Sequence, residues 1–110
     1  MNIGSREITS VTLNKPALID TMNGFIKNFH IANTFISAFN ALLDKNTPED
    51  LDIPDKNISI DIQNLVLVSQ TADTISFKSL IYWGSDEIGY YQLVFTLNGQ
   101  IIDEYFVIYW

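Results

Sequence analysis

The spacing of the apolar residues changes once along this chain, and the change divides it into two halves. Over residues 17–45, apolar residues recur every three or four positions, as on one face of an amphipathic helix. Over residues 58–110, they alternate with polar residues along most of the length, as in half-buried strands. This order predicts an α+β protein in which helical segments pack on the concave face of a curved, four-stranded antiparallel sheet.

The helical half begins directly after Pro16, a residue that fits the first turn of a helix. Its apolar stripe consists of Leu18, Met22, Phe25, Phe29, Ala32, Ile36, Phe39, Leu42 and Leu43. Gly24 and several polar residues interrupt the middle of the stripe, so one kinked helix and two consecutive helices both remain open. A short strand over 7–14 and a capped turn over 47–50 are predicted on either side.

In the second half, Asn98-Gly99 is the strongest turn signal and is typical of a two-residue type I′ hairpin. Counting back from it pairs Phe95 with Ile102, Leu93 with Glu104, Tyr91 with Phe106, Val94 with Asp103, Gln92 with Tyr105 and Tyr90 with Val107. The preceding strand is expected to place Phe77 near Phe95, Ser79 beside Leu93 and Trp83 near Gly89. The apolar run over 65–68 is expected to be buried on both sides or to follow a bulge near Gln63-Asn64.

This register gives the sheet two different faces. The face with Phe95 and Phe106 is the more apolar, so the helical half is expected to cover it. Glu104 is out of place on that face, because a carboxylate among apolar residues is costly unless it is paired, hydrated or protonated. The opposite face is aromatic and semi-apolar, which is typical of a surface that contacts another protein. We therefore predict a homodimer through Tyr90, Val94, Tyr105, Val107 and Tyr109.

Composition limits the chemistry that is open to this chain. Its 110 residues suffice for one domain over 1–110, and the absence of cysteine excludes disulfides, thiolate zinc sites and cysteine nucleophiles. The 13 acidic residues against 6 basic ones argue against nucleic-acid and membrane-surface binding, which need clustered cations. His30 is the one histidine and has no carboxylate four residues away, so we expect no metal site and no cofactor. Neither a membrane span nor a signal peptide is recognisable, which predicts a cytoplasmic protein.

The segment Phe95-Thr96-Leu97-Asn98-Gly99-Gln100-Ile101-Ile102 resembles the aromatic-x-aromatic, Asp-Gly-Lys-Ile hairpin of SnoaL-like proteins, which belong to the nuclear transport factor 2-like superfamily. The order of a helix followed by long antiparallel strands is likewise similar to a cystatin-like roll. The resemblance covers about residues 31–110 and implies alternate side chains of the last strand pointing into a pocket, with Glu104 at a position where SnoaL-like enzymes often keep a polar residue. The inhibitory Gln-x-Val-x-Gly loop of true cystatins is absent, so inhibition of cysteine proteases is not expected.

These patterns first favour a protein that binds a small apolar ligand in a pocket between helix and sheet. The expected lining is Phe25, Phe29, Ile81, Trp83, Tyr91, Glu104 and Phe106. Any catalysis would be proton transfer through Glu104, as in an isomerase or cyclase, and whether the protein is an enzyme at all stays open. The alternative for Glu104 is a structural carboxylate bound to Ser79, Tyr91 or a helix N–H.

A second hypothesis is a non-enzymatic immunity, inhibitor or adaptor protein that binds a basic partner by electrostatic attraction. Acidic residues gather around the middle of the chain, at Asp44, Glu49, Asp50, Asp52, Asp55 and Asp61. Their spacing does not match an EF-hand loop, so a solvated connection is the simpler interpretation. Tyr82, Trp83, Tyr91 and Trp110 fit a ligand cavity, core packing or a dimer contact equally well. A deep cavity would favour the ligand-binding hypothesis, and ordinary core packing would favour the protein-binding one.

Overall fold

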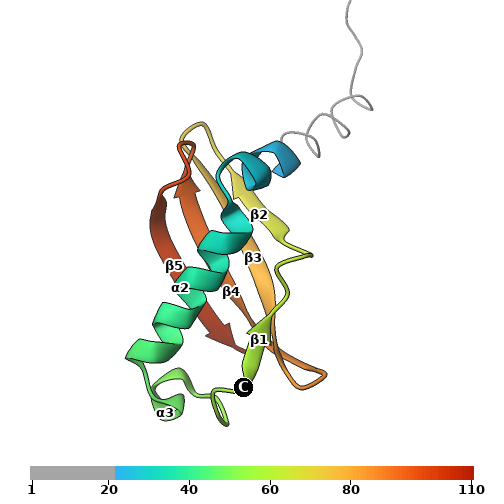
Figure 1. Cartoon of the computed structure of the whole chain (residues 1–110), viewed down its shortest axis with the longest axis vertical. Helices are drawn as coiled ribbons and strands as arrows, with labels where there is room; N and C mark the ends of the chain where they lie inside the picture. The colour runs from blue at the N-terminus through green and yellow to red at the C-terminus, as the bar shows by residue number, and fades with distance from the viewer. Residues whose placement is uncertain (1–21) are drawn as a thin grey trace, which may run out of the picture.

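The computed structural model describes residues 22–110, which form an α+β protein with helices on one face of an antiparallel sheet (Figure 1). Residues 22–28 are helical and precede α2 (Ile31–Lys45) and α3 (Pro48–Leu51). The strands that follow are β1 (Ile58–Ile60), β2 (Val66–Gln70), β3 (Thr74–Trp83), β4 (Asp86–Thr96) and β5 (Ile101–Ile108). The strand predicted over 7–14 and the helix start predicted after Pro16 lie outside the described residues.

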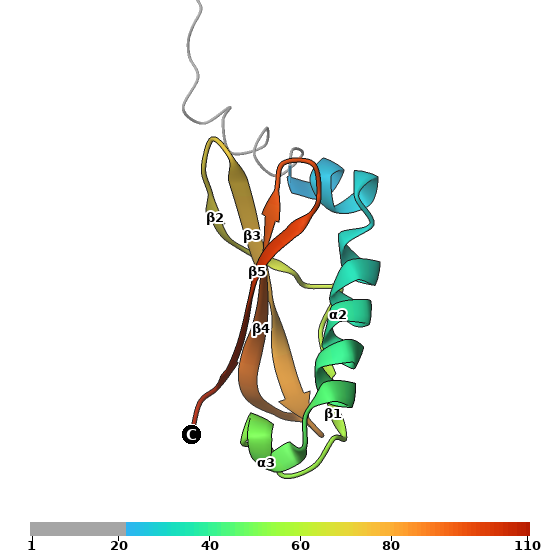
Figure 2. The same cartoon turned by 90° about the vertical axis from the view of Figure 1, so that its left-hand side faces the viewer.

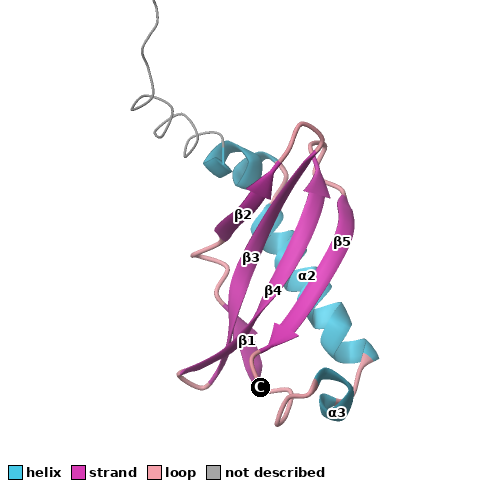
Figure 3. Ribbon diagram, turned by 180° about the vertical axis from the view of Figure 1, so that it is seen from behind, coloured by secondary structure: helices cyan, strands magenta, loops and turns pink. Residues whose placement is uncertain are grey.

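The described residues make two layers, with α2 on one side and the sheet on the other (Figure 2). The strand order is β1-β3-β4-β5. β2 also pairs with β3, but with residues 75–78 of that strand, whereas β1 pairs with residues 81–83. The rear view shows that no described helix lies over the opposite face of the sheet (Figure 3). The prediction of the α+β class is confirmed, but the unclosed sheet has five strands where four were expected.

The fifth strand arises because a turn interrupts the alternating pattern that begins at Ile58 and divides it into β1 and β2. Asp61 accepts hydrogen bonds from the backbone N–H of Gln63 at 3.2 Å and from the side chain of Asn64 at 2.8 Å. A side chain that bonds groups two and three residues ahead stabilises a turn in place of an extended strand. β1 and β2 therefore pair separately with β3, and the bulge lies between Leu67 and Ser69, not near Gln63-Asn64. Val66 and Val68 are exposed, so this run is not buried on both sides.

The helical half breaks into two helices at His30, which settles the alternative between one kinked helix and two. His30 has φ 51° and ψ 46°, in the left-handed region that L-residues seldom adopt. Its N–H donates to the carbonyl of Lys27 at 3.3 Å, and its own carbonyl accepts the N–H of Thr34 at 3.1 Å. His30 thus precedes α2 as its N-cap residue, while its side chain makes no capping hydrogen bond.

The break at His30 also rotates the buried face of α2 relative to the prediction. A continuous helix would bury Phe29 and Ile36 together, but both are more than a third exposed, at 37% and 38%. The structure instead buries Ile31, Phe35 and Phe39. A left-handed residue turns the chain out of the helical period, so the stripe after it starts again from its own first residue.

The core between α2 and the sheet is largely aromatic. Phe35, Phe77, Tyr91 and Phe95 are all fully buried. The ring of Phe35 meets Tyr91 edge to face at 5.9 Å between centroids, and Phe39 meets Tyr91 at 5.4 Å. Such pairs add about 0.5–1.5 kcal/mol beyond the burial of their area. The helix-facing side of the sheet is therefore the apolar side, as the counting of residues from Asn98-Gly99 predicts.

The turn at the end of the last hairpin is not of the predicted type. Gly99 donates its N–H to Thr96 O at 2.9 Å, and Thr96 donates to Gln100 O at 2.8 Å, which encloses three loop residues. Gly99 has φ 86°, whereas Asn98 is not among the described residues with positive φ, as a type I′ turn would require. Phe29 packs so closely here that a Cβ on Gly99 would lie within 3 Å of its ring.

A bulge in β5 compensates for the longer turn. Phe95 pairs with Ile101 and Val94 with Asp103, so Ile102 is an extra residue and does not face Phe95 as predicted. Beyond the bulge, the five other predicted pairs are confirmed: Val94 with Asp103, Leu93 with Glu104, Tyr91 with Phe106, Gln92 with Tyr105 and Tyr90 with Val107. The loop is one residue longer than predicted, and the bulge adds one residue to β5. Because these two differences cancel, the residues of β5 after the bulge lie on their predicted faces.

The register between β3 and β4 differs from the prediction by two residues as far as Ile81 and by three residues at Trp83. Phe77 pairs with Leu93 and Ser79 with Tyr91, and after a further bulge Trp83 pairs with Asp86 in place of Gly89. A shift by two keeps each side chain on its predicted face, because side chains alternate with period two. Phe77 and Phe95 still touch diagonally, with 6.4 Å between ring centroids.

Two buried serines of β3, Ser76 and Ser79, should respond in opposite ways when each is replaced by alanine. Ser79 is fully buried, and its hydroxyl has no hydrogen-bond partner among the described residues. Ser79→Ala should raise the free energy of unfolding by about 1 kcal/mol, because an unsatisfied buried hydroxyl is removed. Ser76, 1% exposed, contacts the hydroxyl of Ser69 at 3.0 Å and the amide of Gln92 at 3.4 Å, so Ser76→Ala should lower it by about 1 kcal/mol.

Urea unfolding of both variants measures this difference. A loss of stability in Ser79→Ala as large as that in Ser76→Ala would show that the Ser79 hydroxyl has a partner in solution.

Candidate functional site

Three parts of the structure carry the residues that the sequence singles out. They are the sheet face opposite α2, the contact between α2 and β5, and the end of the sheet where α3 lies. Each holds side chains that are exposed or polar where ordinary packing would not require them.

The sheet face opposite α2 carries the five residues predicted to form a homodimer, which we call the tyrosine face: Tyr90, Val94, Tyr105, Val107 and Tyr109. Their side chains are half-buried or exposed, with Tyr105 at 46% and Tyr109 at 55%. The ammonium group of Lys78 lies 4.8 Å from the centre of the Tyr90 ring, and the Tyr105 hydroxyl donates to Asp103 at 2.8 Å. The face thus mixes aromatic and apolar side chains with the charges of Lys78 and Asp103, and dimerisation through it stays a prediction.

The contact between α2 and β5 contains Glu104, the predicted catalytic residue. The hydroxyl of the fully buried Tyr91 donates a hydrogen bond to the Glu104 carboxylate, one of the partners expected from the sequence. Glu104 itself is exposed, because β5 is an edge strand of the sheet. Beside it lies a depression of about 230 Å³ lined by Ala38, Ala41, Leu42, Lys45, Ile101 and Glu104.

The residues predicted to line one pocket are distributed along the whole length of the sheet. Ile81 and Tyr91 are fully buried in the core, and Phe106 stacks on Phe39 of α2 at 6.4 Å between ring centroids. The rings of Phe25 and Phe29 lie 4.8 Å apart between centroids, and Phe29 also packs against Gly99 in the β4–β5 loop. Trp83 is 39% exposed at the far end of β3. The structure therefore brings Tyr91, Glu104 and Phe106 together and places Phe29 and Trp83 elsewhere.

Glu104 and its neighbour Asp103 also fit a structural role at the edge of the sheet. Asp103 accepts the backbone N–H of Glu104 at 2.8 Å, so this edge donor is already satisfied within the strand. A charge that points inward, a bulge and a satisfied N–H are features that keep an edge strand from pairing with another chain. β5 has all three, with Ile102 as the bulged residue.

Tyr91 gives the contact a measurable pH dependence. Burial, together with the hydrogen bond to Glu104 and the charge of that carboxylate, raises the pKa of Tyr91 far above its ordinary value near 10. Above pH 10, the unfolded chain loses this phenolic proton while the folded chain keeps it, so stability falls as the pH rises. The wild type should lose about 1.4 kcal/mol per pH unit more than Tyr91→Phe in this range.

Urea unfolding at several pH values above 10 tests this expectation. Parallel pH profiles of wild type and Tyr91→Phe would mean that the Tyr91 hydroxyl ionises as readily in the folded protein as in the unfolded one.

The end of the sheet near α3 brings together residues that are distant in the sequence, and we call it the acidic end. The indole N–H of Trp110 donates to the carbonyl of Asp52 at 2.9 Å, and the hydroxyl of Tyr109 donates to Glu87 at 2.7 Å. Trp83 pairs with Asp86 at the β3–β4 turn. The carboxylates of this end are Glu49, Asp50, Asp52, Asp55, Asp86 and Glu87. Figures 1 and 2 show α3, the β3–β4 turn and the C-terminus at this same end.

Exposed aromatic side chains accompany these charges. Trp83, Tyr109 and Trp110 are 39%, 55% and 60% exposed, although large aromatic residues usually gain from burial. The hydrogen bond to Glu87 raises the pKa of Tyr109 to about 12, so the phenol stays neutral near pH 7. Sequence reasoning missed this cluster as a whole, because only the folded chain brings Trp110 to Asp52.

Part of the acidic end is held by the predicted capped turn, which is confirmed. Thr47 accepts the N–H of Asp50 at 3.1 Å, and Asp50 accepts the N–H of Thr47 at 3.1 Å. The bonds from the Thr47 backbone and side chain lower the pKa of Asp50. α3 is thus a short, capped helix with carboxylates in its first turn, where the helix dipole favours them.

Within residues 22–110, no group of three or more histidine, aspartate or glutamate side chains is arranged to hold a metal ion. No helix in this part of the chain is both long and apolar enough to cross a bilayer. Comparisons of the chain with protein-family models, curated proteins and solved structures found no match.

Proposed function

We propose that this protein is a non-enzymatic binding module that recognises a basic protein partner through its acidic end. The observation that carries the proposal is the joint exposure of Trp83 and Trp110 among six carboxylates. Tryptophan and tyrosine supply much of the binding energy in protein interfaces. A surrounding negative charge speeds the encounter with a positively charged surface and selects against acidic partners.

The packing of the interior supports this proposal over a ligand-binding one. The space between α2 and the sheet is occupied by Phe35, Phe39, Tyr91 and Phe95, all at most 4% exposed. The depression beside Glu104, at about 230 Å³, is smaller than the 300–1,000 Å³ that is usual for small-molecule sites. Immunity, inhibitor and adaptor proteins are the classes that match an acidic module of this kind.

Photo-crosslinking from two matched positions tests the proposal. A p-benzoylphenylalanine at Glu49 lies in the acidic end, and the same residue at Asp73 lies beside the opposite end of β3. Both positions are exposed, and both substitutions remove one negative charge. We expect a basic protein to be crosslinked from position 49 and not from position 73.

The captured protein must then bind again when it is purified. Its association rate with the wild type should fall steeply as salt is added, and Glu49→Gln combined with Asp52→Asn and Glu87→Gln should lower that rate about tenfold at low salt. The proposal would be refuted by a partner that is crosslinked equally from both positions. It would also be refuted by a partner whose association rate changes neither with salt nor with these substitutions.

We further propose that the tyrosine face mediates a homodimer. The support is that Tyr90, Val94 and Val107 are only half-buried on a sheet face over which no described helix lies. Sedimentation equilibrium at micromolar concentrations should show a dimer, and Tyr105→Glu should convert it to a monomer, because like charges would then oppose each other across the interface. A wild-type monomer under these conditions would contradict the proposal.

A second candidate function is small-ligand binding in a SnoaL-like cystatin roll. It is favoured by the hydrogen bond between Tyr91 and Glu104, because Glu104 lines the depression of about 230 Å³ between α2 and β5. If it holds, ligand-observed NMR should detect weak binding of small aromatic ligands such as indole or naphthol. Ala41→Trp would fill the depression and abolish this binding, while Asn40→Trp, one residue away on the exposed side of α2, would leave it intact.

A further inference from the structure

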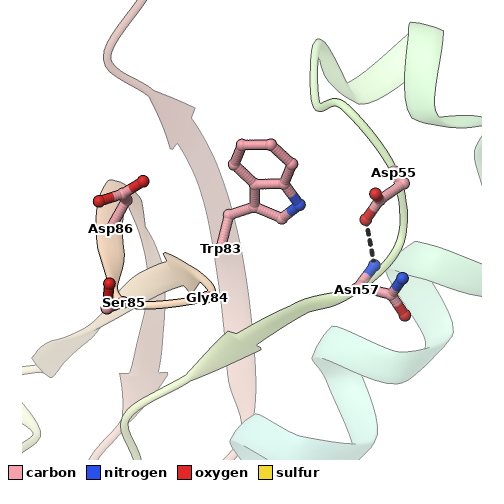
Figure 4. Close-up of a pocket in the computed structure, with 6 residues that line it drawn as sticks. All are labelled: Asp55, Asn57, Trp83, Gly84, Ser85 and Asp86. Atoms are coloured by element: carbon pink, nitrogen blue, oxygen red, sulfur yellow. Dashed lines mark hydrogen bonds between the residues drawn. The ribbon is translucent and has the colours of Figure 1, made fainter.

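The acidic end contains a depression whose walls come from two separate loops. Its volume is about 480 Å³, and it is lined by Asp55, Asn57, Trp83, Gly84, Ser85 and Asp86. Figure 4 shows the Trp83 indole standing between the Asp55–Asn57 loop on one side and the β3–β4 turn with Asp86 on the other. An aromatic ring therefore lies between two carboxylates that are far apart in the sequence.

The walls of this depression are held by local structure. Asp55 accepts the N–H of Asn57 at 2.8 Å, which fixes the bend of its loop and leaves its second carboxylate oxygen available. Trp83 is the last residue of β3 and pairs with Ile58 and with Asp86 on its two sides. Gly84 turns the chain at φ 63°, and the space beside it is open. The Asp55 carboxylate and the backbone that carries Trp83 and Asp86 are thus held by the fold itself.

The chemistry of these walls selects a planar organic cation. A guanidinium group can lie flat against an indole ring by cation–π attraction and stacking, and it can donate N–H bonds to carboxylates at its edge. A phosphate or carboxylate ligand would be repelled by Asp55 and Asp86. A metal ion would find only these two carboxylates here, and residues 22–110 contain no cluster of three or more histidine, aspartate or glutamate side chains arranged to hold one.

We propose that the depression beside Trp83 binds a guanidinium group, supplied by an arginine side chain of the basic partner. The identity of the carrier rests on the function proposed above, whereas the guanidinium site itself does not. The indole face provides the stacking surface, and Asp55 and Asp86 provide the acceptors. The site explains why Trp83 stays exposed at the end of a strand whose other inward side chains are buried.

Titration of the full chain with N-acetylarginine amide tests the site directly. Two-dimensional NMR resolves the indole N–H of Trp83 from that of Trp110, which is bonded to Asp52 and serves as an internal control. We expect saturable shifts of Trp83 and Ser85 with a dissociation constant in the millimolar range. N-acetylcitrulline amide, which has the same shape without the charge, should bind at least about tenfold more weakly.

Matched variants separate the roles of the ring and the carboxylates. Asp55→Asn and Asp86→Asn should each weaken binding about threefold, while Asp73→Asn, which removes the same charge at the other end of β3, should change it little. Trp83→Leu should abolish saturable binding, and Trp83→Phe, which keeps an aromatic face, should restore part of it.

Three results would overturn the site: equal binding of the citrulline amide, equal effects of Asp73→Asn and Asp86→Asn, or no saturable shift at Trp83. Each of these leaves the crosslinking result from position 49 unchanged. Conversely, arginine amide binding without a crosslinked basic protein would support the guanidinium site and refute the proposed function.

Discussion

Phe35→Ala should lower the free energy of unfolding by about 4 kcal/mol, the loss expected for a large aromatic side chain removed from a packed core. Phe35 is fully buried and contacts Tyr91 and Phe95, with 5.9 and 6.2 Å between ring centroids. Truncation removes both aromatic contacts and leaves a cavity between α2 and the sheet that the rings around it cannot fill. Urea unfolding monitored by circular dichroism gives the difference.

Ile36→Ala is the matched control, because Ile36 is the next residue of the same helix and is 38% exposed. It should cost less than about 1 kcal/mol, since more than a third of the side chain already contacts water in the folded protein. The pair therefore reports which face of α2 is buried. A larger loss for Ile36→Ala than for Phe35→Ala would mean that α2 buries the apolar stripe predicted from the sequence, with Ile36 facing the sheet.

Gly89→Ala should destabilise the protein by at least about 3 kcal/mol, although it adds a single methyl group. Gly89 follows the bulge in β4 and pairs with Ile108, and a Cβ at this position would lie 2.0 Å from the carbonyl oxygen of Val107. The obstacle is backbone, so it can be relieved only if β4 and β5 move apart. Thermal and urea unfolding of the purified variant test this, together with hydrogen exchange of the β5 amides.

Gly24→Ala provides the opposite case within the same chain. Gly24 lies in the helix over 22–28, and a Cβ there would meet nothing within 4 Å. The substitution should stabilise the protein by about 0.5–1 kcal/mol, because alanine restricts the unfolded chain and favours a helix. Equal and small effects at both glycines would show that β4 and β5 are farther apart at Gly89 than the structure has them.

The period of the apolar residues predicts the classes of these elements correctly, but not the phase of the main helix. The stripe through Phe25, Phe29, Ala32 and Ile36 is regular in the sequence, and a single left-handed residue interrupts it. Nothing in the residue type of His30 requires φ 51°, since histidine also fits a helix interior. The break follows from tertiary packing, which places Phe25 against Phe77 and Phe35 against Tyr91 at the same time.

The sheet shows why a prediction can be right for an incomplete reason. Asn98-Gly99 marks the corner correctly, yet the loop has three residues, and the bulge at Ile102 restores the register that a two-residue loop would have produced. Glu104 was predicted to need a partner on the helix-facing side, and it has Tyr91. The acidic end could not be predicted, because it joins Asp52, Asp86 and Trp110 from three separate parts of the chain.

The most direct test of the proposed function is to map where a basic ligand contacts the protein. We would titrate the labelled chain with a short peptide of alternating arginine and serine residues and follow every backbone amide by NMR. The proposed function predicts shifts over residues 48–57, 83–87 and 109–110, and these shifts should disappear at high salt. Shifts confined instead to Tyr90, Val94, Tyr105 and Val107 of the tyrosine face, or to the residues around Glu104 and the depression beside it, would contradict it.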